Sequence, residues 1–302
     1  NPRRDFKNGT GIIVTSDGMI MTYLGALGTI DLTKNSYQVV TYDGNNYEAQ
    51  FMGIDSFSDL VFLKISASNL PVVSFEDSSS VYAGEKIIAI GNDLPNYSNQ
   101  YAAGILSRFD PAFNFSGKAL SVSEKFDGAF EYGFSGLNHF VGGPVMTYSG
   151  KIIGMVGSTK KEGKDYFFHI PSNTVKSVLE KAIRKETNTN VALGIYYVPL
   201  TKTYALVNNM NLEKGALIYS SSGQQGLAVI FGSPAAKAGL KINDIITAVN
   251  GEEITLEKNL SNLEKRQADL ALQLDALKRP LESLNSNLND TQNLLNNFNY
   301  IL

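Results

Sequence analysis

The sequence predicts a mainly β protein that ends in an α-helical segment. Short β-branched runs separated by turn residues fill the first two-thirds of the 302 residues, and helical periodicity is nearly absent before residue 171. Leucines then recur at alternating spacings of four and three from Leu256 onwards. Many short strands joined by Gly, Asn and Asp turns are typical of barrels and sandwiches, whereas the leucine spacing predicts a coiled-coil seam.

The strand-like runs follow one another at regular intervals. The first two form a hairpin pattern around Ser16-Asp17-Gly18, a turn composition that hairpins use. The strands that we expect are residues 9–14, 19–22, 37–42, 47–52, 60–65, 86–92, 101–107 and 166–170. Together they predict an all-β unit.

A helix and a polar linker end this unit. Val175, Val178, Leu179 and Ile183 have helical spacing, and we expect Ser172 to cap the helix at its N-terminus. Residues 187–190 are polar and predict a linker.

The composition excludes several functions. The chain is 43% hydrophobic and 18% charged, with a formal net charge of -3. This charge gives no general electrostatic attraction to nucleic acid. It has two histidines and no cysteine, and we therefore expect no metal site and no cofactor. No apolar run could span a bilayer, and the start at Asn1 predicts a processed or trimmed chain whose membrane anchor, where one exists, lies upstream.

The run Gly142-Gly143-Pro144 resembles the catalytic-serine region of trypsin-like proteases. An apolar strand, a Ser149-Gly150 turn and a second apolar strand follow it, as in that family. The family's segment reads Gly-Asn-Ser-Gly-Gly-Pro, which places the serine position on Val141. A valine side chain has no lone pair or acidic proton and cannot attack a carbonyl.

The order of the remaining motifs resembles the HtrA/Deg family of trypsin-like proteases, which carry a C-terminal PDZ domain. The matching motifs are residues 9–13, 55–64, 83–92, 104–107, 170–173, 192–195, 233–246 and 249–251. This resemblance implies a trypsin-like double β-barrel over residues 1–186 and a PDZ-like domain over 191–255. The coiled-coil or helical-hairpin extension would then cover 256–302.

The resemblance also implies where the family's catalytic groups should lie. The histidine position falls on Gly25 and the aspartate on Asp59, while His139 replaces the glycine of the oxyanion site two residues before Val141. Because these groups act as a unit, we expect a catalytically inactive member rather than an enzyme. An active serine endopeptidase that uses other groups, and a purely structural oligomer, remain the alternatives.

For Asp59 and the two histidines we favour structural roles over catalytic ones. We expect Asp59 to cap a turn by accepting backbone N–H bonds, and His139 to be a hydrogen-bonded loop residue. The other histidine, His169, lies in a strand-like run and should be a partly buried wall residue.

Peptide binding is the function that the C-terminal part suggests. In PDZ domains a loop of the Leu-Gly-Ile type presents backbone N–H groups to a peptide carboxylate, and the peptide adds as a strand beside the strand that follows. By resemblance, Leu193, Gly194 and Ile195 stand at this loop. We therefore expect a protein or C-terminal peptide as the ligand.

The heptad series predicts association through helices. Its seam positions are Leu256, Leu260, Leu263, Gln267, Leu270, Leu274, Leu277, Leu281, Leu284, Leu288, Thr291, Leu295, Phe298 and Leu302. Pro280 is compatible with a hairpin turn or with a kink in one helix. The resemblance implies a trimer, and the seam a coiled-coil partner. The whole chain is thus interpreted as a peptide-binding scaffold or regulatory subunit of the cell envelope.

Overall fold

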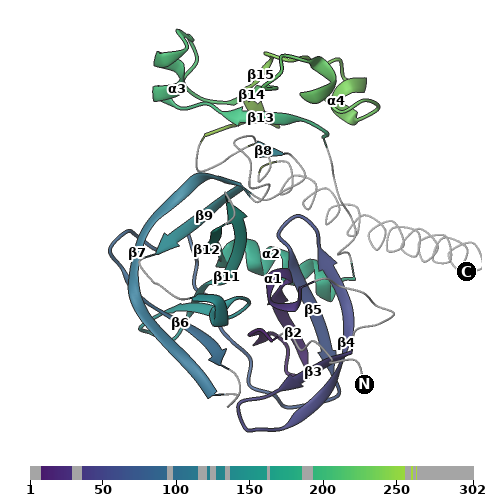
Figure 1. Ribbon diagram of the computed structural model, residues 1–302, viewed down its shortest axis with the longest axis vertical. Helices are drawn as coiled ribbons and strands as arrows, with labels where there is room; N and C mark the ends of the chain where they lie inside the picture. Colours follow the sequence, from purple (N-terminus) through teal and green to yellow (C-terminus); the bar gives the residue numbers. More distant parts are fainter. Residues whose placement is uncertain are drawn as a thin grey trace, which may run out of the picture.

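The computed structural model confirms a mainly β chain (Figure 1). It describes residues 8–28, 36–93, 98–114, 121–122, 127–132, 137–161, 164–185, 193–255, 260 and 263. Within these residues the strands form a five-stranded sheet, a closed barrel and two smaller sheets.

The five-stranded sheet is antiparallel and has the order β1-β2-β5-β4-β3. Its strands are β1 (Ile12–Ile13), β2 (Met19–Tyr23), β3 (Tyr37–Val40), β4 (Asn46–Asp55) and β5 (Leu60–Ile65). The central strand β5 is buried on both faces, because its residues Leu60 to Leu63 are at most 4% exposed. This explains why its sequence is a continuous apolar run.

The closed barrel has the order β10-β11-β12-β9-β7-β6. Its strands are β6 (Lys86–Asp93), β7 (Ser98–Asn114), β9 (Asp127–Tyr132), β10 (Pro144–Thr147), β11 (Ile152–Lys161) and β12 (Lys164–Pro171). Because the barrel is closed, each of these six strands pairs with a neighbour on both sides. A 3-10 turn, η1 (Leu137–Phe140), leads into β10.

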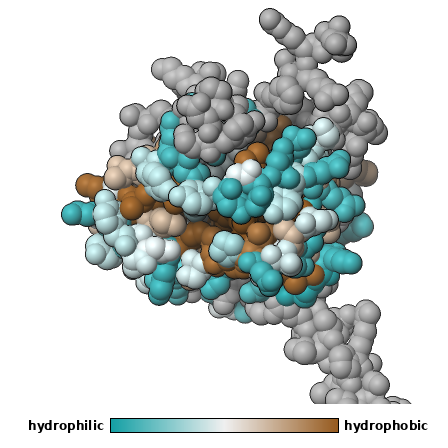
Figure 2. Space-filling view, turned by 90° about the horizontal axis from the view of Figure 1, so that it is seen from below, coloured by the Kyte–Doolittle hydropathy of each residue, from teal (hydrophilic) through white to brown (hydrophobic). Residues whose placement is uncertain are grey.

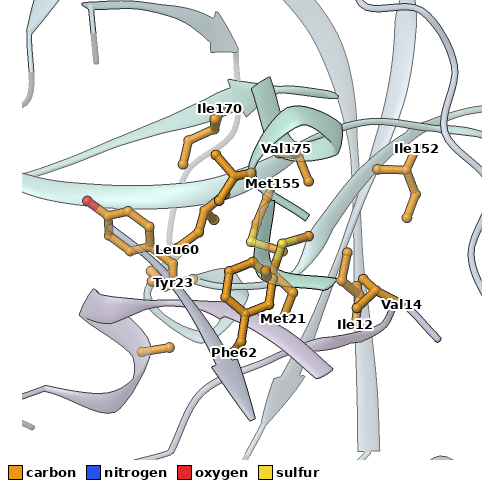
Figure 3. Packing of buried hydrophobic residues seen from close by; sticks show 14 of the residues in the cluster. Ile12, Val14, Met21, Tyr23, Leu60, Phe62, Ile152, Met155, Ile170 and Val175 are labelled. Carbon is orange, nitrogen blue, oxygen red and sulfur yellow. The ribbon is translucent and has the colours of Figure 1, made fainter. Parts of the chain in front are cut away.

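One apolar core joins the sheet to the barrel. Met21 and Phe62 of the sheet pack in the same buried cluster as Met155 and Ile170 of the barrel and Val175 of helix α2 (Figure 3). Seen from below, apolar side chains gather across the middle of this part of the molecule between hydrophilic ones (Figure 2). The described residues contain no helix that is long and apolar enough to cross a membrane.

Helix α2 (Ser172–Ile183) forms where the apolar spacing predicts it, but two details differ. Pro171 is the N-cap residue, and the Ser172 hydroxyl donates to the Glu76 carbonyl oxygen at 2.7 Å instead of capping the helix. Ile183 is 54% exposed, because it lies in the last turn, beyond the barrel surface that buries Val175 and Val178.

The C-terminal unit is built around a four-stranded sheet of order β15-β14-β13-β8. Its strands are β8 (Ser121–Val122), β13 (Tyr196–Pro199), β14 (Ala216–Ile218) and β15 (Ile245–Ile246), and a hairpin of β16 (Ala248–Val249) and β17 (Glu252–Glu253) follows. Its short helical segments are α3 (Lys202–Val207), η2 (Gln225–Leu227) and α4 (Pro234–Lys237). The sheet lies above the barrel in Figure 1.

Two leucines of the heptad series belong to the core of this unit. Leu260 and Leu263 are helical, at most 2% exposed, and packed in one buried cluster with Ile195 and Tyr197. The core therefore extends past residue 255. The rest of the expected coiled coil, residues 256–259, 261–262 and 264–302, lies outside the described residues.

Truncation of Leu263 should destabilise the C-terminal unit. Replacing a buried leucine by alanine costs about 2–5 kcal/mol, so Leu263→Ala should shift the urea unfolding midpoint of this unit clearly downward. Leu206→Ala is the control, because Leu206 is 67% exposed and its truncation should cost within about 0.5 kcal/mol. Equal shifts in the two variants would show that Leu263 is not a core residue.

Candidate functional site

The structure brings the three expected triad positions together at the end of β2. Helix α1 (Leu24–Leu27) begins directly after Tyr23, and the Leu24 N–H donates to the Asp59 carbonyl oxygen at 2.9 Å. The loop that carries Val141 lies against the same strand end, because Thr10 N–H donates to the Val141 carbonyl oxygen at 3.2 Å and Thr22 Oγ1 donates to the Thr10 carbonyl oxygen at 2.6 Å.

Gly25 faces a tightly filled space. A Cβ atom at this position would lie 2.8 Å from Ser158 Oγ and 3.1 Å from the ring of Tyr23. Any side chain here would require Ser158 or Tyr23 to move. Gly25 itself offers no acid or base.

Asp55 caps the turn before β5, a role that we expected of Asp59. Asp55 Oδ2 accepts from the Ser58 N–H at 2.9 Å and from Ser58 Oγ at 2.7 Å, and its carbonyl oxygen accepts from the Asp59 N–H at 2.8 Å. Asp55 is 1% exposed. Asp59 adopts a left-handed backbone with φ of 58°. The Asp-x-x-Ser pattern at residues 55–58 was the sequence signal for the cap that Asp55 forms.

Tyr23 cannot serve as a general base here. Its burial, together with the nearby charge of Asp59, raises the pKa of the phenol far above its ordinary value. The ring packs edge-on against Phe168 at a centroid distance of 6.1 Å. Tyr23 therefore remains a protonated wall of the site (Figure 3).

Val141 is part of the shared apolar core and is 5% exposed. The next residue, Gly142, has φ of 83° and its N–H donates to the Val156 carbonyl oxygen at 2.8 Å. A Cβ atom on Gly142 would lie 2.2 Å from both the Thr10 carbonyl oxygen and Thr22 Oγ1. The loop thus depends on glycine for its close approach to β2.

His139 is the exposed third residue of η1, in agreement with a loop role. Its carbonyl oxygen accepts from Thr10 Oγ1 at 2.9 Å, so the backbone at this position is tied to the same threonine that contacts Val141.

His169 is more deeply buried than we expected. Its ring is fully buried on β12 and stacks on Phe130 of β9 at a centroid distance of 4.7 Å. Burial lowers the pKa of His169 from 6.5 to about 3, so the imidazole is neutral in the folded protein. Among the described residues, no group of three His, Cys, Asp or Glu side chains could hold a metal ion.

The burial of His169 predicts a loss of stability in mild acid. His169 of the unfolded chain takes up a proton below about pH 6.5, whereas in the folded chain it does so only near pH 3. The contribution of His169 to the unfolding free energy is therefore complete above pH 6.5 and decreases as the pH is lowered. Between pH 7.5 and 5.0, wild type should lose about 2 kcal/mol more of its unfolding free energy than His169→Phe, which keeps an aromatic ring against Phe130. Parallel losses in urea titrations of the two proteins would contradict this.

The Gly142 contact predicts a second stability difference. Gly142→Ala and Gly150→Ala both place a side chain at positive φ, but a Cβ at Gly150 meets nothing within 4 Å. The backbone strain of alanine at positive φ is common to both variants and cancels when they are compared. Gly142→Ala should therefore be less stable than Gly150→Ala by about 2 kcal/mol or more in urea unfolding. Equal midpoints would mean that the loop is not held against β2.

The second candidate region is the loop before β13, where Leu193, Gly194 and Ile195 lie together. Gly194 has φ of 80°, and a Cβ atom there would lie 2.3 Å from Ser233 Cβ. Its carbonyl oxygen accepts from the Ile230 N–H at 2.9 Å, while the Leu193 carbonyl oxygen accepts from the Ala235 N–H at 3.0 Å. These bonds fix a sharp turn directly before the edge of β13.

Two family models match parts of this chain. A trypsin-like peptidase domain matches residues 9–155, and a PDZ domain matches residues 227–265. "Serine protease Do-like HtrA" of Bacillus subtilis is 32% identical over 87% of this chain, which covers 56% of that relative. The chain belongs to the HtrA/Deg family.

Further comparisons agree with this assignment. "Probable periplasmic serine endoprotease DegP-like" of Brucella suis is 30% identical over 85% of the chain and 47% of its own length, so the chain spans about half of such curated HtrA relatives. The solved structure "HtrA-type protease AlgW with decapeptide" shares the fold, with a TM-score of 0.61 and 22% identity, and the match covers 85% of this chain and 73% of that one.

These comparisons overturn the expectation that the chain is not an enzyme. Relatives at 30–32% identity are named serine proteases and endoproteases. The expectation rested on the side chains at three positions, and these side chains determine only which catalytic groups those positions can supply. The rest of the chain resembles serine proteases.

Proposed function

We propose that this HtrA-family chain binds extended C-terminal peptides at its PDZ-like unit. The peptide would lie along β13, with its carboxylate at the backbone of Leu193, Gly194 and Ile195. The observation that carries the proposal is the turn at Gly194, which places this loop directly before the edge of a strand. The solved structure of the HtrA-type protease AlgW contains a decapeptide, which supports a peptide as the ligand.

We further propose that Gly25, Asp59 and Val141 occupy the triad positions of the trypsin-like part, and that His139 occupies the oxyanion position. Their convergence at the end of β2 supports this assignment. The chain would then act as a peptide- or protein-binding scaffold or regulatory subunit in the cell envelope, outside the cytoplasm. The periplasmic names of relatives support this location.

The proposed assembly is a homo-oligomer, a trimer by family resemblance. The leucine seam beyond Leu263 adds a candidate coiled-coil contact, and an upstream segment would supply any membrane anchor. Light scattering of the intact chain measures the mass of the assembly.

A serine endopeptidase activity is the second candidate function, and the names of the relatives favour it. Valine supplies no nucleophile and glycine no base, so any turnover would have to use groups other than the side chains of residues 141 and 25.

Peptide binding has a direct test. Fluorescein-labelled decapeptides with free C-termini should bind the intact chain, and C-terminal amidation should weaken the hits. Gly194→Ala should weaken binding at least about tenfold, because its Cβ displaces the loop from Ser233. Gly239→Ala is the control, since its φ is 82° and a Cβ there meets nothing within 4 Å. Hits that ignore amidation would refute the proposal.

Casein hydrolysis tests the second candidate together with the assignment of Val141. Turnover per folded molecule should be the same in wild type and Val141→Ala to within about twofold, because neither side chain can act as a nucleophile. A loss of turnover larger than about tenfold at equal folded fraction would place residue 141 in the reaction machinery.

A further inference from the structure

The edge of β13 that a peptide would use is already paired with another strand of the same chain. β14 pairs with one edge of β13, and β8 pairs antiparallel with the other, with Tyr196 opposite Val122 and Tyr197 opposite Ser121. β8 comes from the connection between β7 and β9 of the trypsin-like barrel. Figure 1 shows it beneath β13, on the side that faces the barrel.

The backbone bonds around Tyr196 show which residues of β13 face β8. The Tyr196 N–H donates to the Ala228 carbonyl oxygen at 2.9 Å, and its carbonyl oxygen accepts from the Tyr219 N–H at 3.1 Å. Both groups are thus engaged within the C-terminal unit. Because backbone groups alternate along a strand, the groups that face β8 are those of Tyr197, which lies opposite Ser121.

We propose that Ser121–Val122 is an internal ligand of the peptide-binding edge, so that an external peptide must displace β8 before it can pair with β13. This inference rests on the proposed peptide-binding function. Peptide binding and release of Ser121–Val122 from β13 are therefore one event.

The internal ligand is suited to displacement. Its described residues, Ser121 and Val122, form two residue pairs with β13, whereas an external peptide can extend along the strand and also present a carboxylate at Gly194. Its tether to the barrel raises its effective concentration, which compensates for the short pairing. The apparent affinity for an external peptide falls by the fraction of molecules in which the edge is open.

A disulfide can hold β8 in place, because the chain contains no cysteine of its own. Val122 and Tyr196 form a pair without mutual backbone bonds, and such pairs have Cα atoms about 4.5 Å apart, which a disulfide can bridge. Oxidised Val122→Cys/Tyr196→Cys should bind the tightest amidation-sensitive library decapeptide at least about tenfold more weakly than the same protein after reduction. The reduced protein is the matched control for both substitutions.

A proline tests the opposite change. Ser121→Pro removes the backbone N–H opposite Tyr197 and should open the edge, giving about 3–10-fold tighter binding of the same decapeptide. Ser121→Ala keeps the backbone donor and should leave the affinity unchanged.

The outcomes separate this inference from the proposed function. If wild type binds the decapeptide and neither oxidation nor Ser121→Pro changes the affinity, β8 is no competitor and the inference falls alone. Failure of the cysteines to form a disulfide would also refute it. If neither wild type nor Ser121→Pro binds any peptide of the library, the proposed function is wrong and the inference falls with it.

Discussion

The close approach of the Gly142 loop to β2 is the constraint on which the trypsin-like part depends. Thr10 contacts both sides of this junction, with its N–H on Val141 and its hydroxyl on the His139 carbonyl oxygen, while Thr22 reaches the Thr10 carbonyl oxygen from β2. No side chain fits at position 142. Because this junction aligns the sheet with the barrel, it also decides which residues meet at the candidate site.

Local pattern predicted the strands well, because apolar alternation and turn residues act within a few positions along the chain. β2, β5, β6 and β12 lie where the sequence predicts them. The predictions failed where residues distant in the sequence form the contact. Ser172 bonds to Glu76, which is remote in sequence, and so does not cap its helix. β8 is two residues long, and only its pairing with β13 makes it a strand, so no periodicity could have revealed it.

The candidate site rests on a resemblance, and its assignment stays a prediction. The resemblance placed Gly25, Asp59 and Val141, and the structure brings them to one strand end. Asp55 caps the turn before β5, because its buried carboxylate accepts both bonds from Ser58. The correction of the expected lack of enzymatic activity has a similar origin: side-chain chemistry at three positions describes those positions, whereas membership of a protease family is a property of the whole chain.

The burial of Leu260 and Leu263 in the C-terminal core has a mechanical consequence. These leucines lie in the same cluster as Ile195 and Tyr197, which flank and form the start of β13. A pulling force applied to the chain beyond residue 263 would therefore act first on the packing beneath β13. Tension on the chain would thereby reach, through Leu260 and Leu263, the strand at which we propose that a peptide binds.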